Sequence, residues 1–161
     1  MTKVLFPGTF DPIHFGHIDI AARAASLFDE VVLAVYDKPL KSLLFSPEER
    51  MALAQKAMEA YPNVTVVGYS GLTVSFAKQI GAKAIVRGLR VFSDFEYEFR
   101  MALANTRLDK EIDTLALITT EANTFLSSST VKEIASYGGN VTSMVPDFVD
   151  QALKEKYGWA A

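Results

Sequence analysis

The feature of this sequence that most constrains the fold is a repeated alternation between short apolar runs and longer segments of helical periodicity. Predominantly apolar residues occupy positions 4–6, 31–36, 64–67, 84–86 and 115–119, and helical spacing occupies 16–28, 46–61, 72–80, 93–108, 127–137 and 146–157. Runs that are apolar throughout are typical of strands buried on both faces of a parallel sheet. The pattern predicts an α/β fold, a Rossmann-like doubly wound five-stranded parallel sheet with helices on both faces.

The ends of several helices have local signals. Ser46, Pro47 and Glu49 form a helix start, in which Ser46 caps, Pro47 takes the first helical position and Glu49 completes a capping box. Gly81 is well placed to end the helix over 72–80, and either Ser93 or Asp94 opens the helix that reaches residue 108. These signals lie inside one domain, which we expect to span residues 1–161.

Composition narrows the classes of function. The 161 residues have a formal net charge of −3 and no cysteine. The charge argues against a general nucleic-acid surface, and the lack of cysteine excludes disulfides, thiolate metal sites and cysteine nucleophiles. We therefore expect no nucleic-acid partner. No apolar run approaches 18 residues, so we also expect no membrane span. The first residues do not resemble a signal peptide, which fits a cytoplasmic protein.

The loop over residues 7–17 follows the first predicted strand, at the edge of the sheet where such folds bind ligands. It contains Gly8 and Gly16, and His17 falls in the first turn of the next helix, whose N-terminus favours anions. One alternative is a turn with two ordinary histidines. Another is a metal site at His14 and His17, although no third ligand lies nearby. Neither GxGxxG after this strand nor a P-loop is present, so the phosphate contacts must be of another kind.

Three further loops at the same edge have groups suited to anions. The loop after the second predicted strand has Lys38 and Lys41, and Arg87-Gly88-Leu89-Arg90 follows the fourth predicted strand. Two arginines there suit bidentate contacts to phosphate oxygens. The alternatives are solvated surface lysines and surface ion pairs.

The loop after the fifth strand opens a helix and is rich in hydroxyl groups: Asn123, Thr124, Phe125, Leu126, Ser127, Ser128, Ser129 and Thr130, with Lys132 in the first turn. Simple capping needs one serine, whereas hydroxyls together with free N–H groups suit an anion. The four loops offer no activated serine, carboxylate pair or zinc cluster. Together they predict phosphoryl or nucleotidyl transfer, with Lys41, Arg87, Arg90 and Lys132 on one rim.

Three sequence motifs identify a family. Residues 8–12, Gly-Thr-Phe-Asp-Pro, followed by His14-x-Gly16-His17, resemble the (H/T)xGH motif of the nucleotidylyltransferase superfamily. Residues 87–90 (RGLR) with 94–98 (DFEYE), and 126–129 (LSSS) with Lys132, resemble the phosphopantetheine adenylyltransferases in particular. The resemblance extends over essentially the whole chain.

That resemblance implies a reaction. ATP and 4′-phosphopantetheine give dephospho-coenzyme A and pyrophosphate, a step of coenzyme A biosynthesis, with Mg²⁺ held mainly by the substrate phosphates rather than by a protein metal site. The family is cytoplasmic and typically homohexameric, and coenzyme A is expected as a feedback ligand. Since the nucleophile is an already ionised phosphate, the chemistry needs no general base.

The resemblance also implies roles for individual residues. Thr9, Lys41 and Arg87 contact the phosphopantetheine phosphate, and Thr73 its pantetheine arm. His17, with Thr9, Lys41 and Arg90, forms the catalytic set, and His17 donates to the ATP α-phosphate. The remaining ATP contacts are Thr9, Phe10, Gly88, Leu89, Arg90, Glu98 and the loop of Asn123, Thr124, Phe125, Leu126, Ser127, Ser128 and Ser129, which takes the β- and γ-phosphates.

Two positions depart from the family pattern: His14, where relatives more often have Thr, and Ser42, where a second lysine is frequent. The alternative function is an adenylyltransferase or cytidylyltransferase acting on another phosphorylated acceptor, such as nicotinamide or nicotinate mononucleotide. The RGLR and DFEYE segments argue against it. A non-catalytic nucleotide-binding module and a class I aminoacyl-tRNA synthetase fragment are further alternatives, and the second lacks a KMSKS-like loop.

Overall fold

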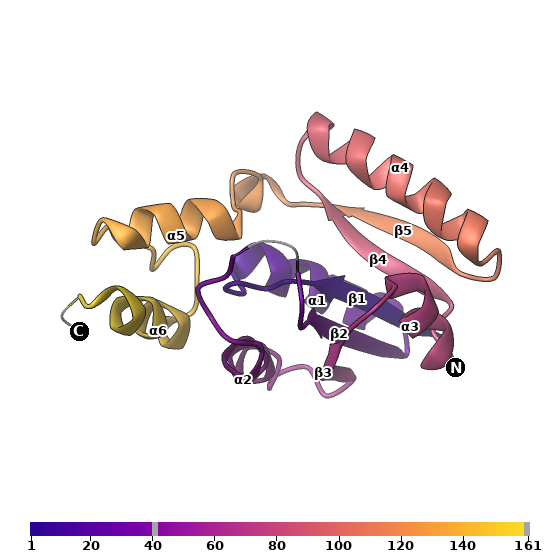
Figure 1. Cartoon of the computed structure of the whole chain (residues 1–161), viewed down its shortest axis with the longest axis horizontal. Coiled ribbons are helices and arrows are strands. Elements are labelled where there is room, and N and C mark those ends of the chain that lie inside the picture. The colour runs from indigo at the N-terminus through magenta and orange to yellow at the C-terminus, as the bar shows by residue number, and fades with distance from the viewer. Residues whose placement is uncertain (40–41, 160–161) are drawn as a thin grey trace.

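The computed structural model describes residues 1–39 and 42–159 and has a single five-stranded sheet (Figure 1). All its strands are parallel, in the order β3-β2-β1-β4-β5. The strands are β1 (Lys3–Gly8), β2 (Glu30–Tyr36), β3 (Val64–Tyr69), β4 (Ala84–Leu89) and β5 (Asp113–Ile118). The helices are α1 (Phe15–Leu27), α2 (Pro47–Ala57), α3 (Thr73–Gln79), α4 (Phe92–Leu108), α5 (Ser128–Ser136) and α6 (Asp147–Tyr157), with a 3₁₀ turn at Glu121–Asn123. The predicted fold class is confirmed.

Alternate side chains of the central strands pack into two separate cores, one on each face of the sheet. Val4 and Phe6 of β1 and Leu33 of β2 face the larger core, which α1, α2, α5 and α6 complete. Leu5 of β1 and Ala34 of β2 face the smaller one, beneath α3. A strand with a core on each face has to be apolar at every position, which is why β1 and β2 read as continuous apolar runs.

Local helix signals are realised at α2. Ser46 Oγ accepts the Glu49 N–H at 3.1 Å, and Glu49 Oε1 accepts the Ser46 N–H at the same distance. Gly81 follows α3 with φ of 73°, a backbone conformation that suits glycine and prevents the helix from continuing. The predicted capping box and helix stop are both confirmed.

Many element boundaries differ from the sequence prediction, and three of these differences bear on the site. β4 extends through Arg87 to Leu89, so most of the RGLR segment belongs to the strand rather than to a loop after it. The pairing with β5 explains the extra length, since it runs without a break from Ala84–Asp113 to Leu89–Ile118. β5 itself begins at Asp113, two residues earlier than predicted. Helix α4 begins at Phe92, because Asp94 acts as its third residue and accepts the Val91 N–H at 3.4 Å.

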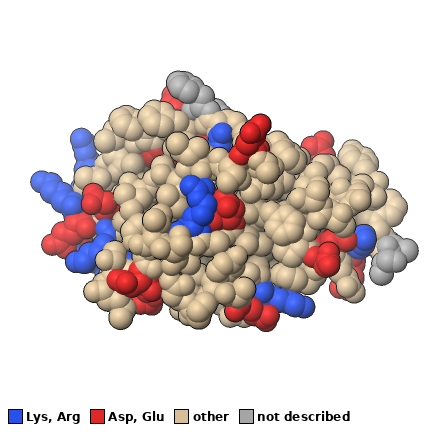
Figure 2. All heavy atoms as spheres, turned by 180° about the vertical axis from the view of Figure 1, so that it is seen from behind, with Lys and Arg blue, Asp and Glu red and all other residues tan. Residues whose placement is uncertain are grey.

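The described residues contain no helix long and apolar enough to cross a membrane. On the face shown in Figure 2, blue and red side chains lie close to one another within a largely uncharged surface. Ion pairs such as Lys78 with Asp109 at 3.0 Å fit that picture.

Candidate functional site

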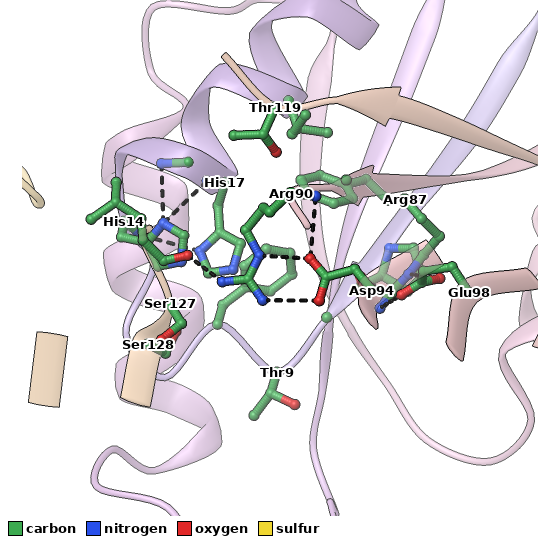
Figure 3. Close-up of a pocket in the computed structure, with 18 of the residues that line it drawn as sticks. Thr9, His14, His17, Arg87, Arg90, Asp94, Glu98, Thr119, Ser127 and Ser128 are labelled. Atoms are coloured by element: carbon green, nitrogen blue, oxygen red, sulfur yellow. Dashed lines mark hydrogen bonds and ion pairs between the residues drawn. The ribbon is translucent and has the colours of Figure 1, made fainter. Parts of the chain in front are cut away.

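A cavity of about 370 Å³ lies at the carboxyl ends of β1, β4 and β5, where sheets of this class bind ligands. Figure 3 shows its polar residues, with the Arg90 guanidinium between the histidine pair and Asp94. The lining comprises Phe6, Pro7, Gly8, Thr9, Phe10, His14, Gly16, His17, Ile20, Arg87, Gly88, Arg90, Asp94, Glu98, Thr119, Leu126, Ser127, Ser128 and Ser129. They come from β1, β4, α1, α4 and α5 and from the segments next to these elements and to β5.

His14 caps helix α1 from the loop after β1. Its Nδ1 accepts the N–H groups of Gly16 at 3.0 Å and His17 at 3.4 Å. A Cβ atom on residue 16 would lie 2.8 Å from the His14 ring, so only glycine fits there. Since a hydroxyl is the usual capping acceptor, this role explains how His can stand where the family motif leads us to expect Thr.

The N–H groups at the start of α1 are therefore occupied. Phe15 N–H donates to the Met144 carbonyl at 2.9 Å, and those of Gly16 and His17 donate to His14. The expectation that this N-terminus offers free N–H groups to an anion is wrong.

His17 is held in one orientation and one tautomer. Its Nδ1 accepts the His14 N–H at 3.1 Å, so in the neutral ring the proton is on Nε2. Its ring stacks on His14 with centroids 3.7 Å apart and meets the edge of Phe10 at 4.8 Å. The result is a fixed Nε2–H donor on the wall of the cavity.

Both histidines are neutral near pH 7. Burial, with a smaller effect of the Arg90 charge, lowers the pKa of His14 from 6.5 to about 3. Burial also lowers the pKa of His17 well below its usual value, with further contributions from His14, Arg90 and Arg87. A neutral imidazole at this point can donate a hydrogen bond without first gaining a proton.

Two arginines of β4 and its end are each held by a carboxylate of α4. Arg87 donates from Nε and Nη2 to the two oxygens of Glu98, at 3.0 Å each, and from Nη1 to the Pro7 carbonyl. Arg90 donates from Nε to Asp94 Oδ2 at 3.1 Å and from Nη1 to the Leu126 carbonyl. These contacts fix both planar groups, so little rotational freedom is lost when an anion binds.

The α5 N-terminus forms the opposite wall. Ser127 is the N-cap residue, and its Oγ accepts the Thr130 N–H at 3.1 Å. Ser128 Oγ donates to the Pro12 carbonyl at 2.9 Å. The N–H groups of Ser128 and Ser129 open the helix and have no intrahelical acceptor, which suits them to phosphate oxygens.

A second cavity, of about 390 Å³, adjoins the first. The two share Pro7, Gly8, Thr9, Arg87 and Glu98. The rest of its lining is mostly apolar or aromatic: Tyr36, Tyr69, Gly71, Leu72, Thr73, Val74, Ile85, Tyr97, Met101, Ala102, Ala104, Asn105, Leu108 and Thr114. Thr73 Oγ1 lies 2.9 Å from the Tyr69 hydroxyl. The site thus has a polar half and an apolar half that meet at Thr9 and Arg87.

Most of the predicted site residues gather around these cavities. Thr9, Phe10, His17, Arg87, Gly88, Arg90, Glu98 and residues 126–129 line the polar one, and Thr73 lines the other. Leu89 instead lines a mostly apolar groove beside Val91, and Asn123, Thr124 and Phe125 are not among the residues that line the polar cavity. Lys41 lies outside the described residues.

Lys132 does not join the rim. Its Nζ donates to Asp11 Oδ2 at 2.7 Å, and it is not among the residues that line either cavity. The prediction that Lys132 adds to the cationic rim is therefore wrong, because a buried carboxylate takes its charge.

Sequence reasoning missed Asp94 and Thr119 as lining residues. Asp94 and Glu98 are four residues apart on α4 and so share a helix face, a spacing that was visible in the sequence beside two arginines three apart. Thr119 directly follows β5, at the edge where ligands bind. The first signal was present in the sequence, whereas the second depends on the end of β5, which the sequence prediction placed at Thr119 itself.

The donor set does not form a protein metal cage. Among residues 1–39 and 42–159, no group of three His, Cys, Asp or Glu side chains gathers around a possible ion. The Nδ1 atoms of both His14 and His17 accept backbone N–H groups, and Asp94 and Glu98 are engaged by arginines.

The parallel sheet, the fixed His17 ring and the arginine pair define a nucleotidyltransferase-type site, and residues 5–134 match the model of the cytidylyltransferase-like family. Curated relatives narrow this class. The chain is 50% identical over 158 residues to the phosphopantetheine adenylyltransferase of Roseiflexus sp. (strain RS-1), covering 98% of this chain and 99% of the relative. It is 50% identical over 157 residues to that of Herpetosiphon aurantiacus, with 98% and 95% covered. The chain belongs to the phosphopantetheine adenylyltransferase family.

A solved structure supports the fold. The crystal structure titled as a "Putative Nicotinate-nucleotide Adenylyltransferase" from Vibrio parahaemolyticus superposes with a TM-score of 0.70. It covers 95% of this chain and 99% of its own, at 18% sequence identity. At that identity the likeness concerns the arrangement of the sheet and helices alone.

Proposed function

We propose that this protein transfers the adenylyl group of ATP to 4′-phosphopantetheine, giving dephospho-coenzyme A and pyrophosphate in the cytoplasm. The observation that carries the proposal is the meeting of a polar and an apolar cavity at Thr9 and Arg87. A triphosphate suits the first cavity, and a long, weakly polar arm that ends in a phosphate suits the second. The two reacting phosphates then lie at the junction.

On the ATP side, His17 Nε2–H donates to the α-phosphate and Arg90 contacts the phosphate chain beside it. The N–H groups of Ser128 and Ser129 take the β- and γ-phosphates. Gly88 and Leu126 line the remainder of this cavity. The pre-formed contacts of Arg90 with Asp94 and Leu126 support this role, because they aim its guanidinium before ATP arrives.

On the acceptor side, Thr9 and Arg87 hold the attacking phosphate, assisted by Lys41. Thr73 and the apolar residues around it contact the pantetheine arm. Coenzyme A contains the same arm, so it competes for this cavity as a feedback ligand.

The reaction is an in-line displacement at the α-phosphorus. An oxygen of the acceptor phosphate forms the new P–O bond while the bond to the β-phosphate breaks, and pyrophosphate leaves. Negative charge grows on the α-phosphoryl oxygens, where His17 and Arg90 donate. Donors of this kind contribute about 10²–10³ each in rate. No proton has to be removed from the nucleophile, which agrees with both cavity carboxylates being committed to arginines.

Mg²⁺ fits this site as a metal held mainly by substrate. It would be coordinated mainly by phosphate oxygens of the substrate while keeping several waters, and such a mode needs no protein cage. When bound, Mg²⁺ neutralises charge on the triphosphate. The residues of the chain then bind the phosphate oxygens that the metal leaves free.

We also propose that the chain assembles as a homohexamer. The support is an exposed apolar surface on α4 and β5, here called the α4–β5 face: Val91, Phe95, Tyr97, Phe99, Met101, Leu103, Leu108, Leu115 and Ile118, each at least 37% exposed. β5 is also an edge strand of the sheet. An exposed apolar surface and an unpaired strand edge both favour burial against another subunit.

The test of the activity is product formation with two acceptors. Purified protein, ATP and Mg²⁺ are mixed with 4′-phosphopantetheine or with nicotinate mononucleotide, and pyrophosphate and nucleotide product are measured. We expect turnover with phosphopantetheine and at least ~100-fold lower kcat/KM with the mononucleotide. The reverse preference, or no pyrophosphate with either, would overturn the proposal.

A further inference from the structure

A buried ion pair lies behind the site and joins segments that are 121 residues apart. Lys132 Nζ, on α5, donates to Asp11 Oδ2 at 2.7 Å, and Asp11 is 2% exposed. The side chain of Lys132 is only 22% exposed. Its charge thus meets a buried carboxylate, and Lys132 is not among the residues that line either cavity.

The same carboxylate also holds a third segment. Asp11 Oδ2 accepts the Leu44 N–H at 3.0 Å, and Oδ1 accepts the Phe45 N–H at 2.9 Å. Leu44 and Phe45 lie at the end of the loop from β2 to α2, the loop that contains the predicted acceptor-phosphate lysine. Asp11 therefore connects α5, the loop after β1 and the loop before α2.

Each of these segments contributes to the proposed site. The loop after β1 has Thr9 and Phe10 and leads into α1 with His17, and α5 begins with the serines of the triphosphate wall. The Ser128 bond to the Pro12 carbonyl, at 2.9 Å, lies beside the ion pair and strengthens the same junction. Phe10, just before Asp11, has a φ of 52°, a backbone conformation that a non-glycine residue keeps only when its surroundings hold it.

We propose that Asp11 and Lys132 are positioning residues for the adenylyl transfer. The pair touches neither substrate. It fixes the distance between the serines on α5 and the donors Thr9 and His17, so that the α-phosphate and the attacking phosphate meet in line. Reaction rates are steep in such distances, since a misplacement of about 1 Å costs about 100-fold. The inference rests on the proposed function, because it concerns the same two substrates.

A double-substitution cycle tests the pair in the full-length protein. We measure kcat, KM for ATP and KM for phosphopantetheine at 25 °C for Lys132→Met, Asp11→Asn and the double variant, with melting temperatures in parallel. We expect kcat to fall about 10- to 100-fold in each single variant with KM for ATP within about threefold, and the double variant to be no worse than the more damaging single one. Lys132→Arg, which keeps the charge, should recover most of kcat.

The matched control is a partly buried ion pair away from the site. The Lys154 Nζ and Asp150 Oδ2 atoms, both on α6, lie 2.9 Å apart, with the Asp150 side chain 11% and the Lys154 side chain 39% exposed. Asp150→Asn and Lys154→Met should lower the melting temperature without lowering kcat. This control separates general loss of stability from loss of alignment.

Several results would overturn the inference. The first is a wild-type kcat in Lys132→Met, and the second is a raised KM for ATP at unchanged kcat, which a phosphate ligand would cause. The third is additive losses of kcat in the cycle. The fourth is a Lys132→Met variant that does not fold at 25 °C. A wild-type protein without turnover contradicts the proposed function instead, so the two failures are distinguishable.

Discussion

His14 and His17 stack with ring centroids 3.7 Å apart, and the Nδ1 atom of each ring accepts a backbone N–H group of the other's segment. The first histidine shapes the start of α1, and the second is thereby fixed with its Nε2–H on the cavity wall. The pair explains why a site for anions works with neutral imidazoles. Their tautomer and orientation are set before any substrate arrives.

We predict that neither histidine titrates near pH 6.5 in the folded protein. The chain has only two histidines, so its two ring Cε1–H signals in an NMR titration report on this pair alone. Since burial lowers both pKa values, and that of His14 to about 3, the signals should stay in their neutral positions from pH 8 to pH 5.5. A midpoint near 6.5 for either ring would contradict the structure.

The same pKa values set how stability depends on pH. The unfolded chain protonates its histidines near pH 6.5, while the folded chain resists, so acid favours unfolding. The contribution is complete above pH 6.5 and falls by up to ~1.4 kcal/mol per pH unit per histidine as the pH drops below it. Urea unfolding at pH 7.5 and 5.5 measures this slope, which His14→Thr should reduce.

We predict that His17→Ala lowers kcat by about 10²–10³ while KM for ATP changes little. The reason is that Nε2–H donates to charge that grows only during the transfer. Steady-state kinetics with both substrates varied gives the two constants, and the melting temperature confirms that the variant is folded. Turnover close to wild type would remove His17 from the mechanism.

At His14 we predict that the capping hydrogen bond matters more than the ring. Thr and Val have nearly the same shape, but only Thr offers an oxygen to the N–H groups of Gly16 and His17. His14→Thr should therefore be more stable than His14→Val by about 1 kcal/mol. Equal free energies of unfolding for the two variants would show that the observed cap contributes nothing.

Much of the fold could be predicted because its signals are local. The apolar runs of β1 and β2 and the Ser46 capping box each lie within a few residues. The ends of β4 and β5 were misplaced because the β4–β5 register, a pairing between distant segments, decides them. Tertiary contacts outweigh local preference at such boundaries.

The residues of the site could largely be predicted, but the hydrogen bonds and ion pairs between their side chains could not. Motif spacing placed Thr9, His17 and the arginines at one edge of the sheet. It did not reveal that Glu98 and Asp94 hold those arginines, or that Lys132 pairs with Asp11 across 121 residues. A basic side chain pairs with a carboxylate that lies near it in the folded chain. A single sequence does not show which of several carboxylates that is.

Arg50 leads to a prediction about stability. It is 1% exposed, and its Nε and Nη1 donate to the carbonyls of Phe45, Thr9 and Tyr36 at 2.7–3.2 Å. Arg50→Met leaves these buried acceptors unpaired, at a cost of about 3–5 kcal/mol in the free energy of unfolding. Urea titration measures it, with exposed Arg107→Met as the control that should change it by less than about 0.5 kcal/mol. A loss below about 1 kcal/mol for Arg50→Met would contradict this account.

The last prediction concerns the α4–β5 face. Phe99 and Leu103 are one helical turn apart on α4, 53% and 58% exposed, and neither lines a cavity. If this face is buried between subunits, the wild type should have six times the 17.7 kDa mass of the chain in light scattering at micromolar concentration, and Phe99→Glu with Leu103→Glu should give smaller species. Leu27→Glu, at a 64% exposed position on α1, is the matched control and should keep the full mass. A monomeric wild type, or an unchanged mass in the variant with both Phe99→Glu and Leu103→Glu, would show that the α4–β5 face is not buried between subunits.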